Sequence, residues 1–152
     1  MKPARNLLIA LLILLGIGAL FGGAVLIISP SGISIGMPVS VMKIAIFPNF
    51  LIPGLALFTI LGVAPILVSV ALVTKPQIGW CQKINACYDM HWAWTFTIYI
   101  ALALIIWLQV EMNCLQAVIW AHSLYMGCAI AIIALALLPN IRTYYKQENL
   151  KK

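Results

Sequence analysis

Hydrophobic and polar positions are segregated into long blocks along this chain. Four predominantly apolar runs, 7–28, 51–73, 94–110 and 118–138, alternate with stretches that hold all of the charged residues. A helix rises about 1.5 Å per residue, so about 20 apolar residues cross the roughly 30 Å hydrocarbon core of a bilayer. The third run is short, and we expect Trp92 and Ala93 to extend it to 92–110. The pattern predicts four membrane-spanning helices.

The alternative for a membrane protein is a β-barrel, and the pattern argues against it. The four runs lack the alternation of apolar and polar positions that barrel strands show, and each is about twice as long as a barrel strand. Lipid offers no water to backbone groups, which leaves helices as the solution. We therefore predict an all-α membrane protein, a single domain over 1–152, with its four helices in an up-down bundle.

The first run could instead be a secretory signal peptide, because Lys2 and Arg5 precede it. The apolar core of a cleaved signal is about 7–15 residues long. The run 7–28 is longer than that, so a retained helix is the favoured interpretation.

Composition supports the membrane assignment. Hydrophobic residues make up 64% and charged residues 8% of the 152 positions, against about 45–50% and about 25% in soluble domains. So few charges cannot coat a water-soluble globule. The composition therefore excludes a soluble enzyme domain, a disordered chain and a conventional nucleic-acid binder, and it indicates membrane lipids as partners.

The basic residues predict the orientation. Lys43 is the only basic residue of the connections on one side of the four spans, and the other side holds the remaining eight of the nine. Lysine and arginine accumulate in cytoplasmic segments. We expect a multi-pass protein of the bacterial cytoplasmic (inner) membrane, with the inner loop 74–91, the basic tail 139–152 and both termini cytoplasmic.

The connections between the spans differ in kind. The outer connection 29–50 is too long for a helix hairpin and too apolar for a solvated linker, so we predict an apolar cap on the outer membrane face. Within the second span, Pro65 removes a backbone hydrogen bond and follows closely on Gly62, which predicts a kink. The last two spans join through a tight turn around Asn113–Gln116.

The four cysteines give only weak candidates for chemistry. Cys81, Cys87 and His91 are weak candidates for metal ligands, but a structural zinc site needs four ligands and only Asp89 is available as the fourth. Thiol–disulfide catalysis is not indicated, because Cys81 and Cys87 lack the Cys-x-x-Cys spacing and lie on the predicted cytoplasmic side. We predict no cofactor.

The better candidate site is at the outer end of the last two spans. Polar side chains gather there around the turn, and the cap can add apolar ones; the candidate ligand-binding residues are Trp107, Gln109, Glu111, Gln116, His122, Met37 and Phe47. Ionisable groups within spans tend to face the bundle interior or a cavity. The alternative is that Glu111 sits at the water boundary and His122 bonds a neighbouring backbone carbonyl. From the level of the residues in an antiparallel pair, we expect the His122 ring to approach Trp107 or Gln109 before Glu111.

Several local patterns resemble a known group of sequences. They are Ser-Pro-Ser-Gly-x3-Gly-Met-Pro over 29–38, Leu-Ile-Pro-Gly-Leu over 51–55, Ile106-Trp107, Gln109, Gln116-Ala117, and Ala-Leu-Leu-Pro-x-x-Arg over 136–142. Together they are similar to small uncharacterised bacterial four-helix integral membrane proteins. The resemblance spans most of the chain and implies the same architecture. Because that group has no assigned activity, the resemblance implies no catalytic residue.

These features predict a non-enzymatic function. The chain is expected to bind a lipid-like or small apolar ligand, or a partner protein, beneath its outer cap. The alternative is a membrane enzyme or proton-coupled carrier that uses Glu111 and His122 as an acid–base pair. A second copy of the chain or another membrane protein stays open as a partner.

Overall fold

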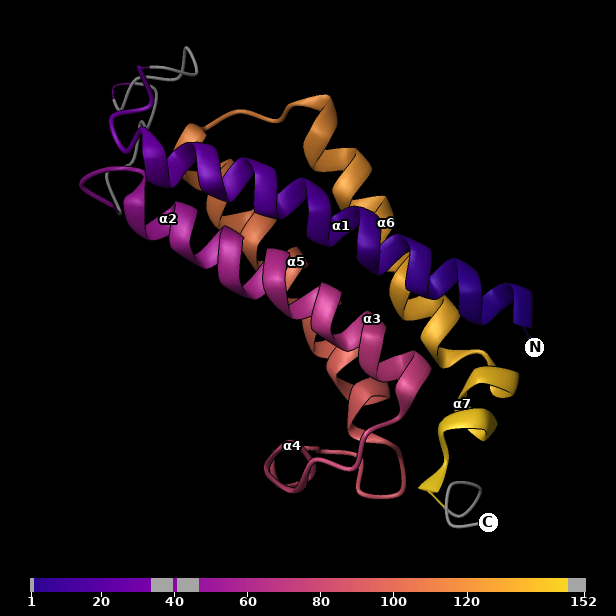
Figure 1. Ribbon diagram of the computed structural model, residues 1–152. Coiled ribbons are helices and arrows are strands. Elements are labelled where there is room, and N and C mark those ends of the chain that lie inside the picture. The colour runs from indigo at the N-terminus through magenta and orange to yellow at the C-terminus, as the bar shows by residue number, and fades with distance from the viewer. Residues whose placement is uncertain (1, 34–39, 41–46, 148–152) are drawn as a thin grey trace.

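The computed structural model describes residues 2–33, 40 and 47–147, and in these residues it is helical without β-strands (Figure 1). The elements are α1 (Lys2–Ile28), α2 (Leu51–Ala56), η3 (Leu57–Val63), α3 (Ala64–Thr74), α4 (Gly79–Lys83), α5 (Trp92–Leu115), α6 (Trp120–Leu137) and α7 (Pro139–Tyr145). Most of the predicted cap, including Met37, lies outside the described residues.

Four helical stretches are long and apolar enough to cross a membrane, as the sequence predicted. They are Pro3–Ile28, Leu51–Thr74, Trp92–Leu115 and Trp120–Leu137. The helix α5 continues past residue 110, the predicted end of the third span, to Leu115. The charge of Glu111 ends the apolar run, but a helical backbone does not need apolar side chains to continue. The helix ends at Gln116, which adopts the left-handed conformation with φ 49°.

Helix α1 lies alongside α2, η3 and α3, and α5 lies alongside α6 (Figure 1). Further contacts of α1 with α6 and of α3 with α5 join the two pairs. We call the end where Gln116–Ile119 connects α5 to α6 the hairpin end. The opposite end, where α1 begins and α7 lies, is the tail end.

The outward faces of the long helices are apolar. On α1, Leu8, Leu12 and Leu15 are buried against the other helices, whereas Leu14 and Phe21 are exposed. A helix that is hydrophobic on every side is typical of a membrane span, because lipid takes the place of water around it.

Glycines allow α1 to approach the second helical stretch very closely. A Cβ atom on Gly23 would lie 2.7 Å from the backbone nitrogen of Phe58, and one on Gly54 would lie 3.1 Å from that of Ile27. Small residues let membrane helices pack through their backbones in this way. Gly127 of α6 differs, because a Cβ atom there would meet nothing within 4 Å. The four-residue spacing of Gly127 and Ala131 therefore does not mark a close contact within the described chain.

Pro65 is accommodated by a π-helix. The segment η3 ends two residues before Pro65, and the backbone N–H of Ala64 donates to the carbonyl of Thr59, five residues back. A proline ring clashes with the carbonyl four residues earlier. The wider π-helical turn changes that backbone spacing, and such turns interrupt membrane helices where the regular ladder is broken.

The basic tail is folded onto the inner loop as far as residue 147. Tyr145 is fully buried. Its hydroxyl donates to the carbonyl of Leu72 (2.7 Å), and its own carbonyl accepts from the N–H of His91 (2.8 Å). The N–H of Gln147 donates to the carbonyl of Asp89 (2.8 Å). We call this set of contacts between 139–147 and 72–91 the tail latch.

Two basic side chains contact Tyr144 in the tail latch. The ammonium nitrogen of Lys75 lies 3.5 Å from the centre of the Tyr144 ring, and Arg5 donates to the Tyr144 hydroxyl (3.0 Å). Burial acts to raise the pKa of Tyr144, but Lys75 and Arg5 outweigh it and leave the pKa below its ordinary value. The tail latch thus joins the beginning of α1, the end of α3 and the start of α5.

Candidate functional site: an apolar cavity at the hairpin end

An apolar cavity of about 290 Å³ lies at the hairpin end, between α1, the α2–η3 stretch and α5. We call it the main cavity. Its lining consists of Phe21, Gly22, Val25, Leu26, Phe47, Phe50, Pro53, Leu57, Trp107, Val110, Glu111, Cys114 and Leu115. Among the described lining residues, Glu111 has the only carboxylate, and most of the other side chains are apolar or aromatic.

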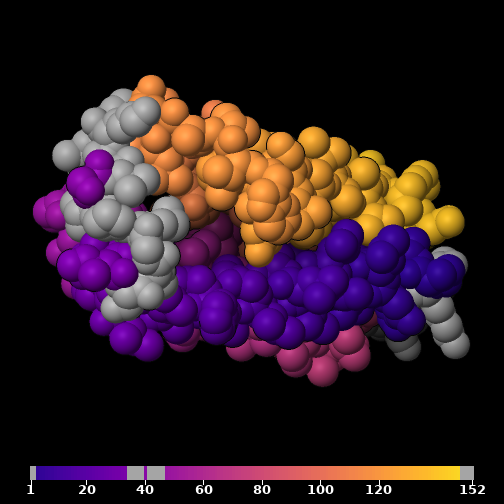
Figure 2. Space-filling model, turned by 90° about the horizontal axis from the view of Figure 1, so that it is seen from above, coloured from indigo at the N-terminus to yellow at the C-terminus, as the bar shows by residue number. Residues whose placement is uncertain are grey.

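A smaller cavity of about 180 Å³ adjoins the main one. Gly22, Leu57, Trp107 and Glu111 line both. Figure 2 shows a hollow between α1, in indigo, and the orange helices, with magenta atoms at its floor, which fits a lining drawn from α1, η3, α5 and α6. The two cavities are therefore neighbouring parts of one apolar space that reaches into the bundle from the hairpin end.

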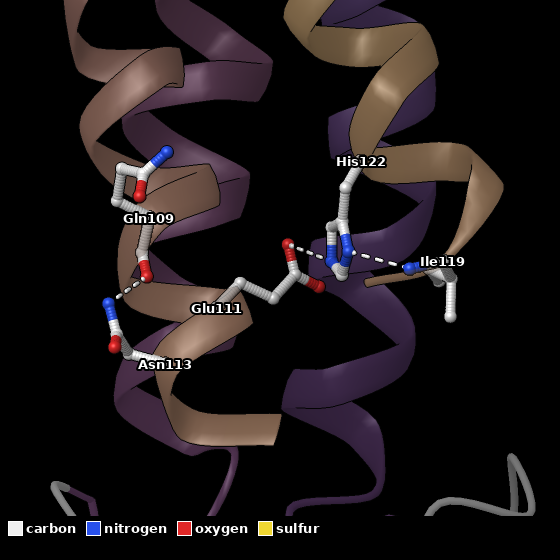
Figure 3. A network of polar contacts seen from close by, with 5 residues as sticks. All are labelled: Gln109, Glu111, Asn113, Ile119 and His122. Carbon is white, nitrogen blue, oxygen red and sulfur yellow. Dashed lines mark hydrogen bonds and ion pairs between the residues drawn. The ribbon is translucent and has the colours of Figure 1, made fainter. Parts of the chain in front are cut away.

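Glu111 and Trp107 face this space together. They are four residues apart on α5, and residues at that spacing share one face of a helix. The Glu111 side chain is 37% exposed, and its Oε2 lies 3.7 Å from Nε2 of His122 on α6 (Figure 3). The carboxylate is thus held between the cavity and the neighbouring helix.

The His122 ring is fixed by the backbone at the start of α6. Nδ1 accepts a hydrogen bond from the N–H of Ile119 (3.1 Å), while the N–H of His122 donates to the Ile119 carbonyl (3.0 Å). An imidazole nitrogen that accepts carries no proton, so the ring is neutral and its proton is on Nε2. His122 is buried, and Nε2 has no hydrogen-bond partner among the described residues.

We expected the His122 ring to approach Trp107 or Gln109 before Glu111, and for Gln109 this expectation is wrong. Figure 3 shows Gln109 on the other side of α5 from His122, whereas Glu111 points toward the ring. Consecutive helical residues are about 100° apart, so Gln109 and Glu111 lie on nearly opposite faces. The distance of 3.7 Å between Glu111 and His122 is nevertheless longer than a hydrogen bond. The alternative expectation, that the His122 side chain bonds a backbone carbonyl, is also wrong, since its ring accepts from the backbone N–H of Ile119.

The other predicted site residues separate into two groups. Trp107 and Phe47 line the main cavity. Gln116 does not line either cavity, because it ends α5 and donates to the carbonyl of Asn113 (2.9 Å). Met37 lies outside the described residues.

Sequence reasoning missed the part of the lining that comes from the first two spans, and it missed Tyr125 of the fourth. Phe21 and Gly22 of α1 and Leu57 of η3 line the main cavity, and Tyr125 of α6 lines the smaller one. The glycines of the first run were the available signal, since a residue without a side chain leaves space beside it. Apolar residues such as Leu57 give no signal in a chain that is apolar throughout.

The weak metal candidates do not assemble. In the part of the chain that the structure describes, no three His, Cys, Asp or Glu side chains are placed to hold a metal ion. The His91 ring instead caps α5, accepting from the N–H of Ala93 (3.2 Å) and contacting the carbonyl of Pro76 (3.2 Å). Burial lowers the pKa of His91 and raises that of the Cys81 thiol. A protonated thiol is a poor metal ligand.

Comparisons with known proteins found no matching family model, no matching curated protein and no matching solved structure. The resemblance to small bacterial four-helix membrane proteins therefore stays a prediction.

Proposed function

We propose that this protein is a small integral protein of the bacterial cytoplasmic membrane, with four spans in an up-down bundle and both termini cytoplasmic. The outward apolar faces support membrane insertion, since water would not solvate them. The distribution of lysine and arginine supports the orientation.

Within the membrane, we propose that the protein binds a lipid-like or small apolar ligand and is not an enzyme. The observation that carries this proposal is the main cavity, whose volume of about 290 Å³ is close to the lower end of small-molecule sites, which are roughly 300–1,000 Å³. Such sites combine a largely apolar lining with a few polar groups. A concave apolar space of this size favours a small ligand over a partner protein as the occupant.

The alternative, a membrane enzyme or proton-coupled carrier, is supported by one observation, the approach of Glu111 to His122. The protonation of the His122 ring weakens this alternative. Nε2 already carries the proton and has no free lone pair, so the ring can take a second proton only at Nδ1, which accepts from the N–H of Ile119 and does not face Glu111. We therefore favour binding.

The ligand-binding proposal is tested by filling the main cavity. Val110 lines the cavity, and Val110→Phe places a larger side chain there. Val70 on α3 is 55% exposed, so Val70→Phe is a matched control on an outward face. We expect native mass spectrometry of the gently solubilised protein to show a bound small molecule. Its occupancy should fall by about tenfold in Val110→Phe, roughly the effect of 1.4 kcal/mol, and stay unchanged in Val70→Phe.

A wild-type protein without a bound species, or equal occupancy in the two variants, would contradict the proposal. The alternative function has its own test in the double variant Glu111→Gln and His122→Gln. Loss of a proton-coupled activity in that variant, with occupancy retained, would favour the carrier.

A further inference from the structure

Among the described residues, the Glu111 carboxylate has no lysine or arginine as an ion-pair partner. It nevertheless lines both cavities. The basic residues of the described chain lie mainly at the tail end, where Arg5 and Lys75 contact Tyr144. A charge at the wall of an apolar space is costly unless something of opposite charge or a set of hydrogen bonds compensates it.

His122 does not supply that charge. The bond that Nδ1 accepts from Ile119 keeps the ring neutral, because both ring nitrogens of an imidazolium are donors. The Nε2–H points at the Glu111 carboxylate from 3.7 Å (Figure 3) and is itself without an acceptor at hydrogen-bond distance among the described residues. His122 therefore faces the carboxylate without neutralising it.

Part of the cavity wall is aromatic. Trp107 lies one helical turn away and also lines both cavities, and Phe21, Phe47 and Phe50 line the main one. Aromatic faces attract cations, and the attraction grows where water is excluded. A carboxylate beside aromatic rings in an apolar cavity is complementary to one class of molecule.

We propose that the ligand of the main cavity is a lipophilic organic cation whose charge pairs with Glu111 and whose apolar part lies among the aromatic side chains. This inference rests on the proposed binding function and names the chemistry of its ligand. The volume of the main cavity, about 290 Å³, limits the bound part to roughly one substituted ring or a short chain.

The test uses two probes of the same shape. Benzyltrimethylammonium is a small aromatic cation, and neopentylbenzene is its neutral carbon isostere. Binding of each to the detergent-solubilised full chain is measured by equilibrium dialysis against protein-free detergent. We expect the wild type to bind the cation at least about tenfold more tightly than the isostere, as one partly desolvated charge contact supplies.

The variants assign that preference to one side chain. Glu111→Gln removes the charge and should abolish the preference for the cation, whereas Glu111→Asp keeps the charge and should keep part of the preference. Asp89→Asn is the matched control, since Asp89 is another of the chain's three acidic residues and lies at the opposite, tail end. It should leave binding of both probes unchanged. The thermal transition of each variant confirms that the bundle remains folded.

The outcomes separate the two proposals. Equal binding of both probes, or a preference that survives Glu111→Gln, overturns the inference and leaves the binding function standing. Binding of neither probe to the wild type overturns the inference. A ligand-free wild type in native mass spectrometry overturns the proposed function with it.

Discussion

The two histidines of this chain cap helices with the same ring atom. Nδ1 of His91 accepts from the N–H of Ala93 at the start of α5, and Nδ1 of His122 accepts from that of Ile119 at the start of α6. Their other nitrogens differ. Nε2 of His91 meets the carbonyl of Pro76, while Nε2 of His122 faces Glu111. Of the two rings, only that of His122 is directed toward the candidate site.

The buried cap predicts a pH dependence of stability. Burial lowers the pKa of His91 in the folded protein, whereas the unfolded side chain titrates near its ordinary value of about 6.5. Below that value the unfolded state binds more protons, so stability is lost as the pH falls. His91→Asn keeps a side-chain acceptor for the N–H of Ala93 but does not titrate.

Thermal unfolding in detergent from pH 7.5 to 5.5 checks this. The wild type should lose more stability than the variant, by at most about 1.4 kcal/mol per pH unit. The comparison concerns the slopes with pH, because the variant also loses the contact with Pro76. Parallel slopes would contradict the assignment.

At the scale of helices, the sequence predicted the four long apolar helices, but it did not predict features that depend on single local contacts. The four spans could be predicted because each is a long apolar block. The cap by His91 could not, because histidine is not among the preferred N-cap residues. The accommodation of Pro65 was expected as a kink, but a proline alone does not say whether the helix bends or widens into a π-turn. Glu111 could be predicted as a site residue because a charge is conspicuous at the end of an apolar run. Leu57 could not, because it is one apolar residue among many.

The glycine contacts predict which helix pair is most sensitive to a single methyl group. In Gly23→Ala, the added Cβ would lie 2.7 Å from the backbone nitrogen and 2.8 Å from the Cα atom of Phe58. Backbone atoms cannot move aside as a side chain can, so α1 and η3 must separate. We expect a loss of about 1–3 kcal/mol, typical of overpacking, measured by thermal unfolding of the solubilised protein.

Gly127→Ala is the control for that experiment. Nothing within 4 Å meets the added Cβ, and alanine favours a helix over glycine. Its stability should be unchanged or slightly higher. If the two variants were equally destabilised, the close approach of α1 and η3 would be wrong.

For the whole molecule, the proposed orientation predicts opposite labelling at the two ends. Tyr145 is buried in the tail latch and is unsuitable as a labelling site. Asn140 on α7 and Ala117 in the α5–α6 connection are both exposed. In a background without the four native cysteines, an impermeant maleimide should label Ala117→Cys in intact cells. It should label Asn140→Cys only after permeabilisation, and the reverse pattern would overturn the orientation.

The tail latch also bears on how the protein is made. Membrane proteins are synthesised from the N-terminus, so residues 139–147 leave the ribosome after all four spans. Until then the N–H of His91 lacks its acceptor on Tyr145, and the carbonyl of Leu72 lacks its donor. Earlier segments generally fold first during synthesis. The tail end is therefore completed last, and a chain interrupted just before residue 139 would present four long helices without the contacts that close their tail end.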